Sequence, residues 1–294
     1  MTGPERGFLL LSSHLGEQNR KPLTTVQLRI LAERVQGALP ELQDRELEMQ
    51  DLMKLGYGRE MAGRIASLLG EEDVLDYYLR KGAVLGCTPV TRISENYPLH
   101  LRKRLGLDAP GVLWARGDLS LLQLPMVALV GSRELREENW KFAAEVGLQA
   151  ARQGYVLVSG NARGADRTAQ ESCLRAGGKV ICVVADELWK QPLRENMLYL
   201  SEGDYEEGFS AQRALSRNRV IHALGIITFV AQATLEAGGT WDGTVKNLQN
   251  RWSTVYGFGD GSDAMRELSQ RGLELIGMED LMDFYDLPKD KCLI

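Results

Sequence analysis

The sequence is poor in the residues from which metal sites and covalent cross-links are usually built. Among its 294 residues there are four cysteines without a CxxC pair, and three widely separated histidines. The cysteines are Cys87, Cys173, Cys182 and Cys292. Structural zinc sites place such residues at close spacings, and disulfide frameworks are typical of small secreted chains. We therefore expect no metal and no disulfide, but buried thiols in a reducing, cytoplasmic environment.

Long apolar runs are also missing. No run approaches the roughly 20 residues that are needed to span a bilayer. The apolar stretch from Gly7 to Leu11 is too short for the core of a signal peptide and follows the acidic Glu5. With 44% hydrophobic and 26% charged residues the composition is that of a globular protein. We expect no membrane association.

The common catalytic signatures are absent as well. The chain has no GxxxxGK[ST] phosphate loop and no GxGxxG after its first predicted α/β strand. It shows no recognisable Ser/His/Asp arrangement, and Asp166 has no second carboxylate at a meaningful spacing. These absences argue against ATP hydrolysis and against a standard dinucleotide site. We expect no catalytic residues and no cofactor.

Excess positive charge is lacking too, since the formal net charge is −5. Its distribution is uneven. Residues 85–260 carry 20 basic and 19 acidic residues, against 11 and 13 in residues 1–84 and 4 and 8 in residues 261–294. Affinity for phosphates follows local rather than total charge, so a basic patch in the central segment remains compatible with the composition.

Residues 1–84 show helical patterning without the alternation of strands. Apolar residues recur at helical spacing in residues 25–35, 56–70 and 71–79, and two threonines precede the first of these segments as N-cap candidates. We predict a small helical N-terminal domain over residues 1–84. Such domains bind partners or DNA in some proteins, but a simple packing module is the commoner role.

Short apolar strands alternate with helices from Pro125 onward. The predicted strands are residues 127–130, 155–158, 180–184, 226–230 and 254–258, and the predicted helices are residues 138–153, 165–176, 211–224, 243–251 and 262–270. This alternation predicts an α/β fold, with a mostly parallel sheet and helices on both faces. Ligands of such sheets bind beyond the carboxyl ends of the strands. The loops that follow the strands are therefore the place to look for a site.

The first of these loops is Gly131-Ser132-Arg133. Glycine allows a close approach of the backbone to a ligand, serine offers a hydroxyl, and arginine offers a forked donor that suits phosphate. An ordinary turn with a solvated arginine is the alternative.

The second loop runs from Ser159 to Asp166. Gly160 and Gly164 flank Arg163 and precede a predicted helix, whose free N–H groups could cradle an anion. Asp166 either contacts the ligand or caps the helix.

A third basic segment, Arg217-Asn218-Arg219, lies within a predicted helix. Its two arginines point to different faces of that helix, so at most one of them lies plainly on the outer surface. A solvated run of charge is the usual explanation of such a segment.

Taken together and in this order, the three segments resemble the GSR loop, the SGxAxGID loop and the RNR segment of the DNA-processing protein A (DprA/Smf) family. The resemblance extends from Tyr97 to Leu281 and includes Gly238-Gly239-Thr240, where the family has a serine-glycine turn. It implies a Rossmann-like SLOG/LOG-type core over residues 85–286, followed by a tail, residues 287–294. It also implies a non-enzymatic, dimeric protein that binds and protects single-stranded DNA in recombination and natural transformation and assists loading of RecA.

Carried over to this sequence, the resemblance implies a phosphate-binding pocket. Its residues would be Gly131, Ser132, Arg133, Ser159, Gly160, Arg163, Gly164, Asp166, Arg217, Asn218, Arg219, Gly238, Gly239 and Thr240. Trp241 or Tyr205 could stack on a base. The sequence departs from the family at Ala165, at Gln170 and in the acidic segment 203–208.

Three alternatives remain open. The pocket could sense a small nucleotide, as in defence-related relatives of the fold. It could cleave an N-glycosidic bond, because Gly238-Gly239-Thr240 echoes the PGGxGTxxE motif of the phosphoribohydrolases, although the catalytic glutamate of that motif is missing. It could also be vestigial in a partner-binding scaffold, although arginine occurs in all three segments.

Overall fold

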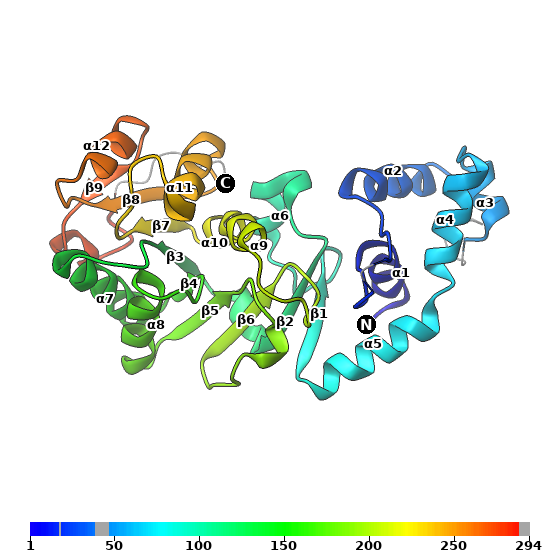
Figure 1. Ribbon diagram of the computed structural model, residues 1–294, viewed down its shortest axis with the longest axis horizontal. Helices are drawn as coiled ribbons and strands as arrows, with labels where there is room; N and C mark the ends of the chain where they lie inside the picture. The colour runs from blue at the N-terminus through cyan, green and yellow to red at the C-terminus, as the bar shows by residue number, and fades with distance from the viewer. Residues whose placement is uncertain (18, 39–46, 288–294) are drawn as a thin grey trace.

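The computed structural model describes residues 1–17, 19–38 and 47–287 (Figure 1). Helices precede the sheet, which begins at β1. They are α1 (Gly3–Ser12), α2 (Thr25–Gln36), α3 (Met49–Lys54), α4 (Arg59–Leu69) and α5 (Glu72–Val84). Residues 288–294 lie outside the described residues, and with them Cys292 and almost all of the expected tail.

The helical N-terminal segment begins at well-formed caps. In α1 and α2 the side chains of Thr2 and Thr24 accept hydrogen bonds from backbone N–H groups of the first turn, while Glu5 and Gln27 reciprocate. Helices α2, α3 and α4 enclose a small apolar cluster together with Leu11 of α1 and Leu23. The helices expected at 25–35, 56–70 and 71–79 correspond to α2, α4 and α5, whereas α1 and α3 were not predicted.

Among the described residues, the chain from β1 onward forms one nine-stranded sheet and the helices that cover it. Its strands are β1 (Cys87–Thr91), β2 (Val112–Gly117), β3 (Met126–Val130), β4 (Val156–Ser159), β5 (Lys179–Val183), β6 (Met197–Ser201), β7 (Ile227–Val230), β8 (Thr254–Phe258) and β9 (Glu274–Ile276). Their spatial order is β1-β2-β6-β5-β4-β3-β7-β8-β9. Pairing is parallel from β6 to β9 and antiparallel only where β1 meets β2 and β2 meets β6. The expected mostly parallel sheet is confirmed.

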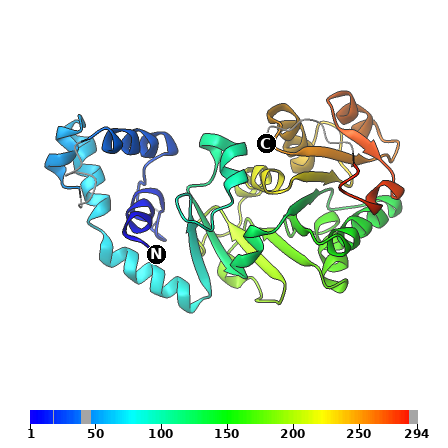
Figure 2. The same cartoon turned by 180° about the vertical axis from the view of Figure 1, so that it is seen from behind.

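Helices cover both faces of this sheet (Figure 1, Figure 2). The core helices are α6 (Leu99–Leu105), α7 (Glu137–Arg152), α8 (Ala165–Arg175), α9 (Ala211–Ser216), α10 (Asn218–Leu224), α11 (Gly238–Asn250) and α12 (Asp263–Gln270). Short 3-10 turns complete the core: η2 (Gly106–Asp108), η3 (Leu119–Gln123), η4 (Leu188–Lys190) and η5 (Glu279–Met282). Because side chains alternate along a strand, Val127 and Leu129 of β3 pack with α7 and α8, whereas Ala128 and Val130 pack with α10.

Two predicted helices differ in detail from the structure. The helix expected over residues 211–224 is divided into α9 and α10 at Arg217, whose side chain turns inward. Helix α11 begins at Gly238 rather than at residue 243. Its N-cap is Ala237, and Gly238 takes a φ of 82°, which glycine adopts without steric cost.

The acidic segment 203–208 lies against the helical N-terminal segment. Asp204 accepts hydrogen bonds from the Ser13 hydroxyl at 2.8 Å and from the Gly16 N–H at 2.7 Å. Glu206 pairs with Lys81 of α5 at 2.7 Å. Between them the Tyr205 ring stacks on Tyr78, with ring centroids 4.4 Å apart. These acids therefore serve to dock residues 1–84 on the core. We propose 1–84 and 85–286 as the two structural units.

Cys87, Cys173 and Cys182 are free and buried, as expected of structural thiols. In the part of the chain that the structure describes, none of the helices combines the length and the apolar character needed to cross a membrane.

Candidate nucleic-acid interface

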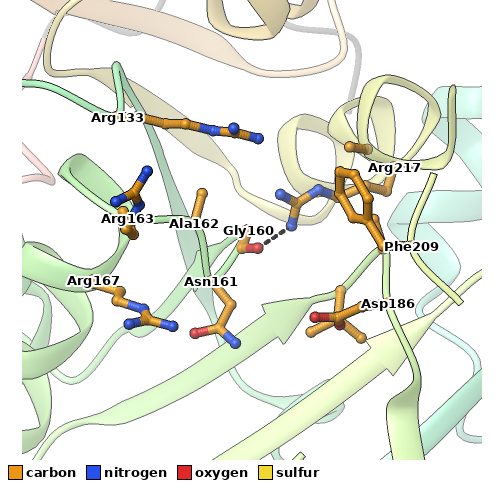
Figure 3. Close-up of a pocket in the computed structure, with 12 residues that line it drawn as sticks. Arg133, Gly160, Asn161, Ala162, Arg163, Arg167, Asp186, Phe209 and Arg217 are labelled. Atoms are coloured by element: carbon orange, nitrogen blue, oxygen red, sulfur yellow. Dashed lines mark hydrogen bonds between the residues drawn. The ribbon is translucent and has the colours of Figure 1, made fainter. Parts of the chain in front are cut away.

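A pocket of about 200 Å³ opens beyond the carboxyl ends of β4 and β5 (Figure 3). It is lined by Arg133, Gly160, Asn161, Ala162, Arg163, Arg167, Val184, Ala185, Asp186, Phe209, Ala214 and Arg217. The loops after β3, β4 and β5 and the segment around α9 all contribute to it. This is the position that the topology of a parallel sheet predicts for a ligand.

Arg217 forms the inner wall of the pocket. Its side chain is buried, and its Nη1 donates hydrogen bonds to the backbone carbonyls of Gly160 and Val183. Its Nε is also buried and has no hydrogen-bond partner among the described residues. Burial lowers the pKa of the Arg217 guanidinium, and the negative charge of Asp166 opposes that shift. An anion in the pocket would supply the missing compensation for this cation.

Asp166 fixes the backbone of the second loop, residues 159–166. Its Oδ2 accepts hydrogen bonds from the N–H groups of Gly160 and Ala162, both at 3.1 Å. Burial raises the pKa of this carboxyl, while Arg217 and the two N–H donors hold it down. The sequence left a capping role and a ligand role open, and the observed hydrogen bonds are those of a residue that braces the loop.

The first two loops cross at Gly164. This residue has a φ of 80°, and a side chain there would run into the backbone of Ser132 and Arg133. Ser132 donates its hydroxyl to the Gln232 carbonyl at 3.2 Å and is not among the residues that line the pocket. Arg133 projects from the crossing as an exposed side chain. Close packing of Gly131 on Ala165 lets the two loops approach each other in this way.

Three exposed arginines form a cationic wall. Arg133, Arg163 and Arg167 lie together on one side of the pocket, facing Arg217 across it (Figure 3). Arg167 was missed in the sequence. The signal was its position in the first turn of α8, directly after the loop that carries Arg163.

Several predicted site residues lie outside the lining of this pocket. Asn218 donates its amide to the Gly239 carbonyl at 3.0 Å and thereby joins α10 to the start of α11, where Gly238 and Thr240 also lie. Ser159 accepts a hydrogen bond from Gln170 beneath the loop. The direct binding role of these residues remains a prediction, whereas their observed contacts brace neighbouring elements.

Arg219 also points away from the pocket. Its guanidinium forms an ion pair with Glu202 at 2.5 Å and donates to the Asp108 carbonyl at 3.1 Å. Burial raises the pKa of the Glu202 carboxyl, and Arg219 opposes that shift. Arg219 therefore ties α10 to the end of β6, so that of the RNR segment only Arg217 lines the pocket.

The aromatic residues expected to stack on a base are buried. Trp241 is 8% exposed and Tyr205 is fully buried, so that expectation was wrong for both. The aromatic side chain that does line the pocket is Phe209, which is 62% exposed. A single phenylalanine between an acidic segment and a helix start was the available signal. Within residues 1–17, 19–38 and 47–287, no group of three or more histidine, cysteine or acidic side chains could hold a metal.

Gly160 supports a direct test of this packing. A Cβ at this position would lie against the guanidinium of Arg217. We expect Gly160→Ala to destabilise the protein by about 2 kcal/mol, because overpacking of a tight site costs about 1–3 kcal/mol. Urea unfolding measures this. Gly63→Ala on α4, where a Cβ meets nothing within 4 Å, should instead raise stability by about 0.5–1 kcal/mol, because alanine is favoured over glycine inside a helix. Equal stability of the two variants would contradict the packing described here.

Sequence comparison identifies the family. The profile of the family described as DNA recombination-mediator protein A matches residues 88–256, more than half of the chain. DNA processing protein DprA of Streptococcus pneumoniae is 31% identical over 207 residues, which cover 65% of this chain and 72% of that protein. DNA processing protein DprA of Bacillus subtilis is 28% identical over 176 residues, which cover 56% of this chain and 57% of that protein.

Structural comparison agrees over almost the whole chain. The X-ray structure of DprA from S. pneumoniae superposes with a TM-score of 0.70 at 25% identity, and covers 96% of this chain and 97% of that one. DNA processing protein A from Helicobacter pylori, whose structure was described for its single-stranded DNA binding mode, shares the fold. Its TM-score is 0.57 at 23% identity, with 67% of this chain and 94% of that chain covered. The chain belongs to the DNA recombination-mediator protein A (DprA/Smf) family.

Proposed function

We propose that this protein binds single-stranded DNA as a DNA-processing protein of recombination, with the backbone phosphates held in the arginine-lined pocket. The observation that carries the proposal is Arg217, a buried cation whose Nε has no partner among the described residues and which faces three exposed arginines. The DNA binding mode of the H. pylori relative supports it.

The charge of the pocket supports the same proposal. The net charge of −5 and the acidic segment 203–208 argue against a polyanionic ligand only if those acids face it. Asp204 and Glu206 instead contact the helical N-terminal segment. The pocket keeps four arginines against one carboxylate, Asp186. Phosphate binding follows this local balance.

Fluorescence anisotropy with labelled oligonucleotides over a salt series tests the proposal. Affinity for single strands should fall with salt, with log K against log salt sloping by about −0.7 for each phosphate neutralised. Three or four arginines in contact then give a slope of about −2 to −3. Millimolar affinity at low salt, or an affinity independent of salt, would overturn the proposal. Duplex DNA of the same length serves as the comparison.

Phe209 should contribute through base stacking. Alanine substitution of an aromatic that stacks on a base costs about 1–3 kcal/mol. We therefore expect Phe209→Ala to weaken single-strand binding by about tenfold while the salt dependence stays the same, because no phosphate contact is lost. Trp140→Ala on α7, which is also exposed but lies outside the pocket, is the matched control. An unchanged affinity of the Phe209 variant would show that this side chain does not contact the DNA.

We further propose that the protein acts without catalysing a reaction, in the cytoplasm, as a homodimer that assists RecA. The family resemblance supports each of these points. Light scattering at several concentrations tests the dimer, and co-purification with RecA in the presence of single-stranded DNA tests the partner. A monomer at micromolar concentration would contradict the proposed dimer. Failure of the protein to retain RecA would contradict the proposed partner.

A further inference from the structure

The pocket has two unlike sides (Figure 3). Arg133, Arg163 and Arg167 occupy one side, while Phe209, Asp186 and the buried Arg217 lie on the other. Asp186 follows directly after the loop residues Val184 and Ala185 beyond β5. No sequence pattern singled it out, and among the described residues that line the pocket it is the sole carboxylate.

Gln191 holds the Asp186 side chain in place. Its Oδ1 accepts a hydrogen bond from the Gln191 amide at 3.0 Å. That amide also donates to the Glu187 carbonyl at 3.1 Å, and the oxygen of the Gln191 side chain accepts a hydrogen bond from Asn161 at 3.4 Å. Within the described ranges no basic side chain forms an ion pair with Asp186, and its Oδ2 accepts no hydrogen bond. The Asp186 carboxylate is therefore oriented through its Oδ1, while its Oδ2 is available to accept a hydrogen bond from a ligand.

A carboxylate in a phosphate-binding pocket needs an explanation, because it repels the anion that the arginines attract. Asp186 offsets part of the positive charge of Arg217. Its remaining oxygen can accept a hydrogen bond only from a part of the ligand that is not anionic, which in a nucleotide means the base or the sugar. Phe209 beside it offers a surface on which a base can stack. The two sides therefore match the two ends of one nucleotide unit.

Ionised carboxylates only accept hydrogen bonds. The Watson–Crick edge of guanine presents two adjacent donors, N1–H and the N2 amine, which match the two oxygens of a carboxylate. Cytosine and adenine present one amine beside a ring acceptor. Thymine presents one N–H between two carbonyls, which a carboxylate repels. A fixed carboxylate thus reads a base by its Watson–Crick edge, with guanine the best and thymine the worst partner.

We propose that Asp186 makes the pocket select guanine, so that the nucleotide unit seated there is a guanine nucleotide. This inference rests on the proposed binding of single-stranded DNA and adds a base preference to it. The arginines hold the phosphate whatever the sequence, and Asp186 sets which base of the strand occupies the pocket.

Octamers in lithium buffer test the preference by anisotropy. The probes are d(TG)₄, d(TI)₄ with inosine, which lacks the N2 amine, and dT₈. A good bidentate contact discriminates by about tenfold, and half of the registers of d(TG)₄ seat a guanine. We expect d(TG)₄ to bind about fivefold tighter than dT₈, with d(TI)₄ between them. Equal affinity for all three would overturn the inference while leaving the proposed function intact. Failure of every octamer to bind would overturn the proposed function.

Asp186→Asn separates selection from general affinity. It keeps the side-chain shape and an oxygen for Gln191 but removes the negative charge. All octamers should then bind at least as tightly, while the preference for d(TG)₄ falls below twofold. Glu187→Gln, the neighbouring carboxylate outside the pocket lining, should keep the fivefold preference. A preference that survives in the Asp186 variant would overturn the assignment.

Competition with free nucleotides distinguishes the two sources of such a unit. Displacement of labelled d(TG)₄ by dGMP more readily than by dTMP supports the recognition of guanine by Asp186. If dGMP also binds more tightly than the octamer, the physiological ligand is a free nucleotide rather than a strand, which would overturn the proposed function but not the base preference. Equal displacement by dGMP and dTMP would overturn the preference.

Discussion

Replacing Arg133 with alanine is expected to weaken the binding of single-stranded DNA by ten- to a hundredfold and to leave the fold intact. A hydrogen bond to a charged group is worth about 1.5–3 kcal/mol, which corresponds to a loss of about that size. Arg133 is exposed at the tip of the first loop, where the backbone is fixed by Gly164 and not by the Arg133 side chain. The melting temperature should therefore stay within about one degree of that of the unaltered protein.

Arg136→Ala provides the matched control. Arg136 lies three residues further along, is also exposed, and pairs with Asp260 at 2.8 Å outside the pocket. Its loss should leave the slope of log K against log salt unchanged, whereas loss of Arg133 should make that slope shallower by about 0.7. Equal effects of the two variants would show that the affinity for DNA depends on the general surface charge and that DNA does not bind in the pocket.

The place of the site could be predicted from the sequence because it depends on backbone topology. Short apolar strands followed by Gly131 and by Gly160 mark the carboxyl ends of two parallel strands, and parallel pairing brings these ends to one edge. Arg133 and Arg163 follow within three residues of those glycines and reach one pocket because β3 and β4 are neighbouring strands. Arg217 follows no strand, so only the family resemblance placed it in the pocket, and its burial shows that it forms the inner wall.

Side-chain direction and distant segments could not be predicted in this way. Asn218 and Arg219 are adjacent to Arg217, yet a helix turns each neighbour by about 100°, so they face α11 and Glu202 instead. Phe209 and Asp186 reach the pocket from loops after β6 and β5, and no motif marks them. The edge strands β1 and β2 are antiparallel additions outside the β-α alternation, so the pattern that predicted the core did not extend to them.

The second large effect that we expect concerns the free energy of unfolding and its dependence on pH, and it arises from His222. It is fully buried between α10 and α11, and burial lowers its pKa to about 3. The Asn247 amide lies 2.9 Å from His222 Nδ1 and donates to it, since the same amide donates to the Ser253 hydroxyl and its oxygen accepts the Ser253 N–H. The ring proton therefore resides on Nε2. A second proton on Nδ1 would face the Asn247 donor.

The sign of the pH effect follows from this geometry. An unfolded chain protonates His222 near pH 6.5, whereas the folded chain resists protonation down to about pH 3. The unfolded state thus binds more protons in this window, so the free energy of unfolding falls as the pH falls through it. The cost is about 1.4 kcal/mol per pH unit, or about 3 kcal/mol between pH 6.5 and pH 4. His100, whose pKa burial lowers to about 4, adds to the loss.

We expect His222→Gln to remove its share of this pH dependence. Asp166 and Glu202, whose pKa values burial raises, act in the opposite direction, so the total slope is smaller than that of the histidines alone. The difference between variant and unaltered protein isolates His222, because the other groups are common to both. Urea unfolding between pH 7 and pH 4 should show this difference shifting in favour of the variant by about 1.4 kcal/mol per pH unit below pH 6.5. A curve for the variant that runs parallel to that of the unaltered protein would mean that His222 takes up a proton in the folded state as readily as in the unfolded one.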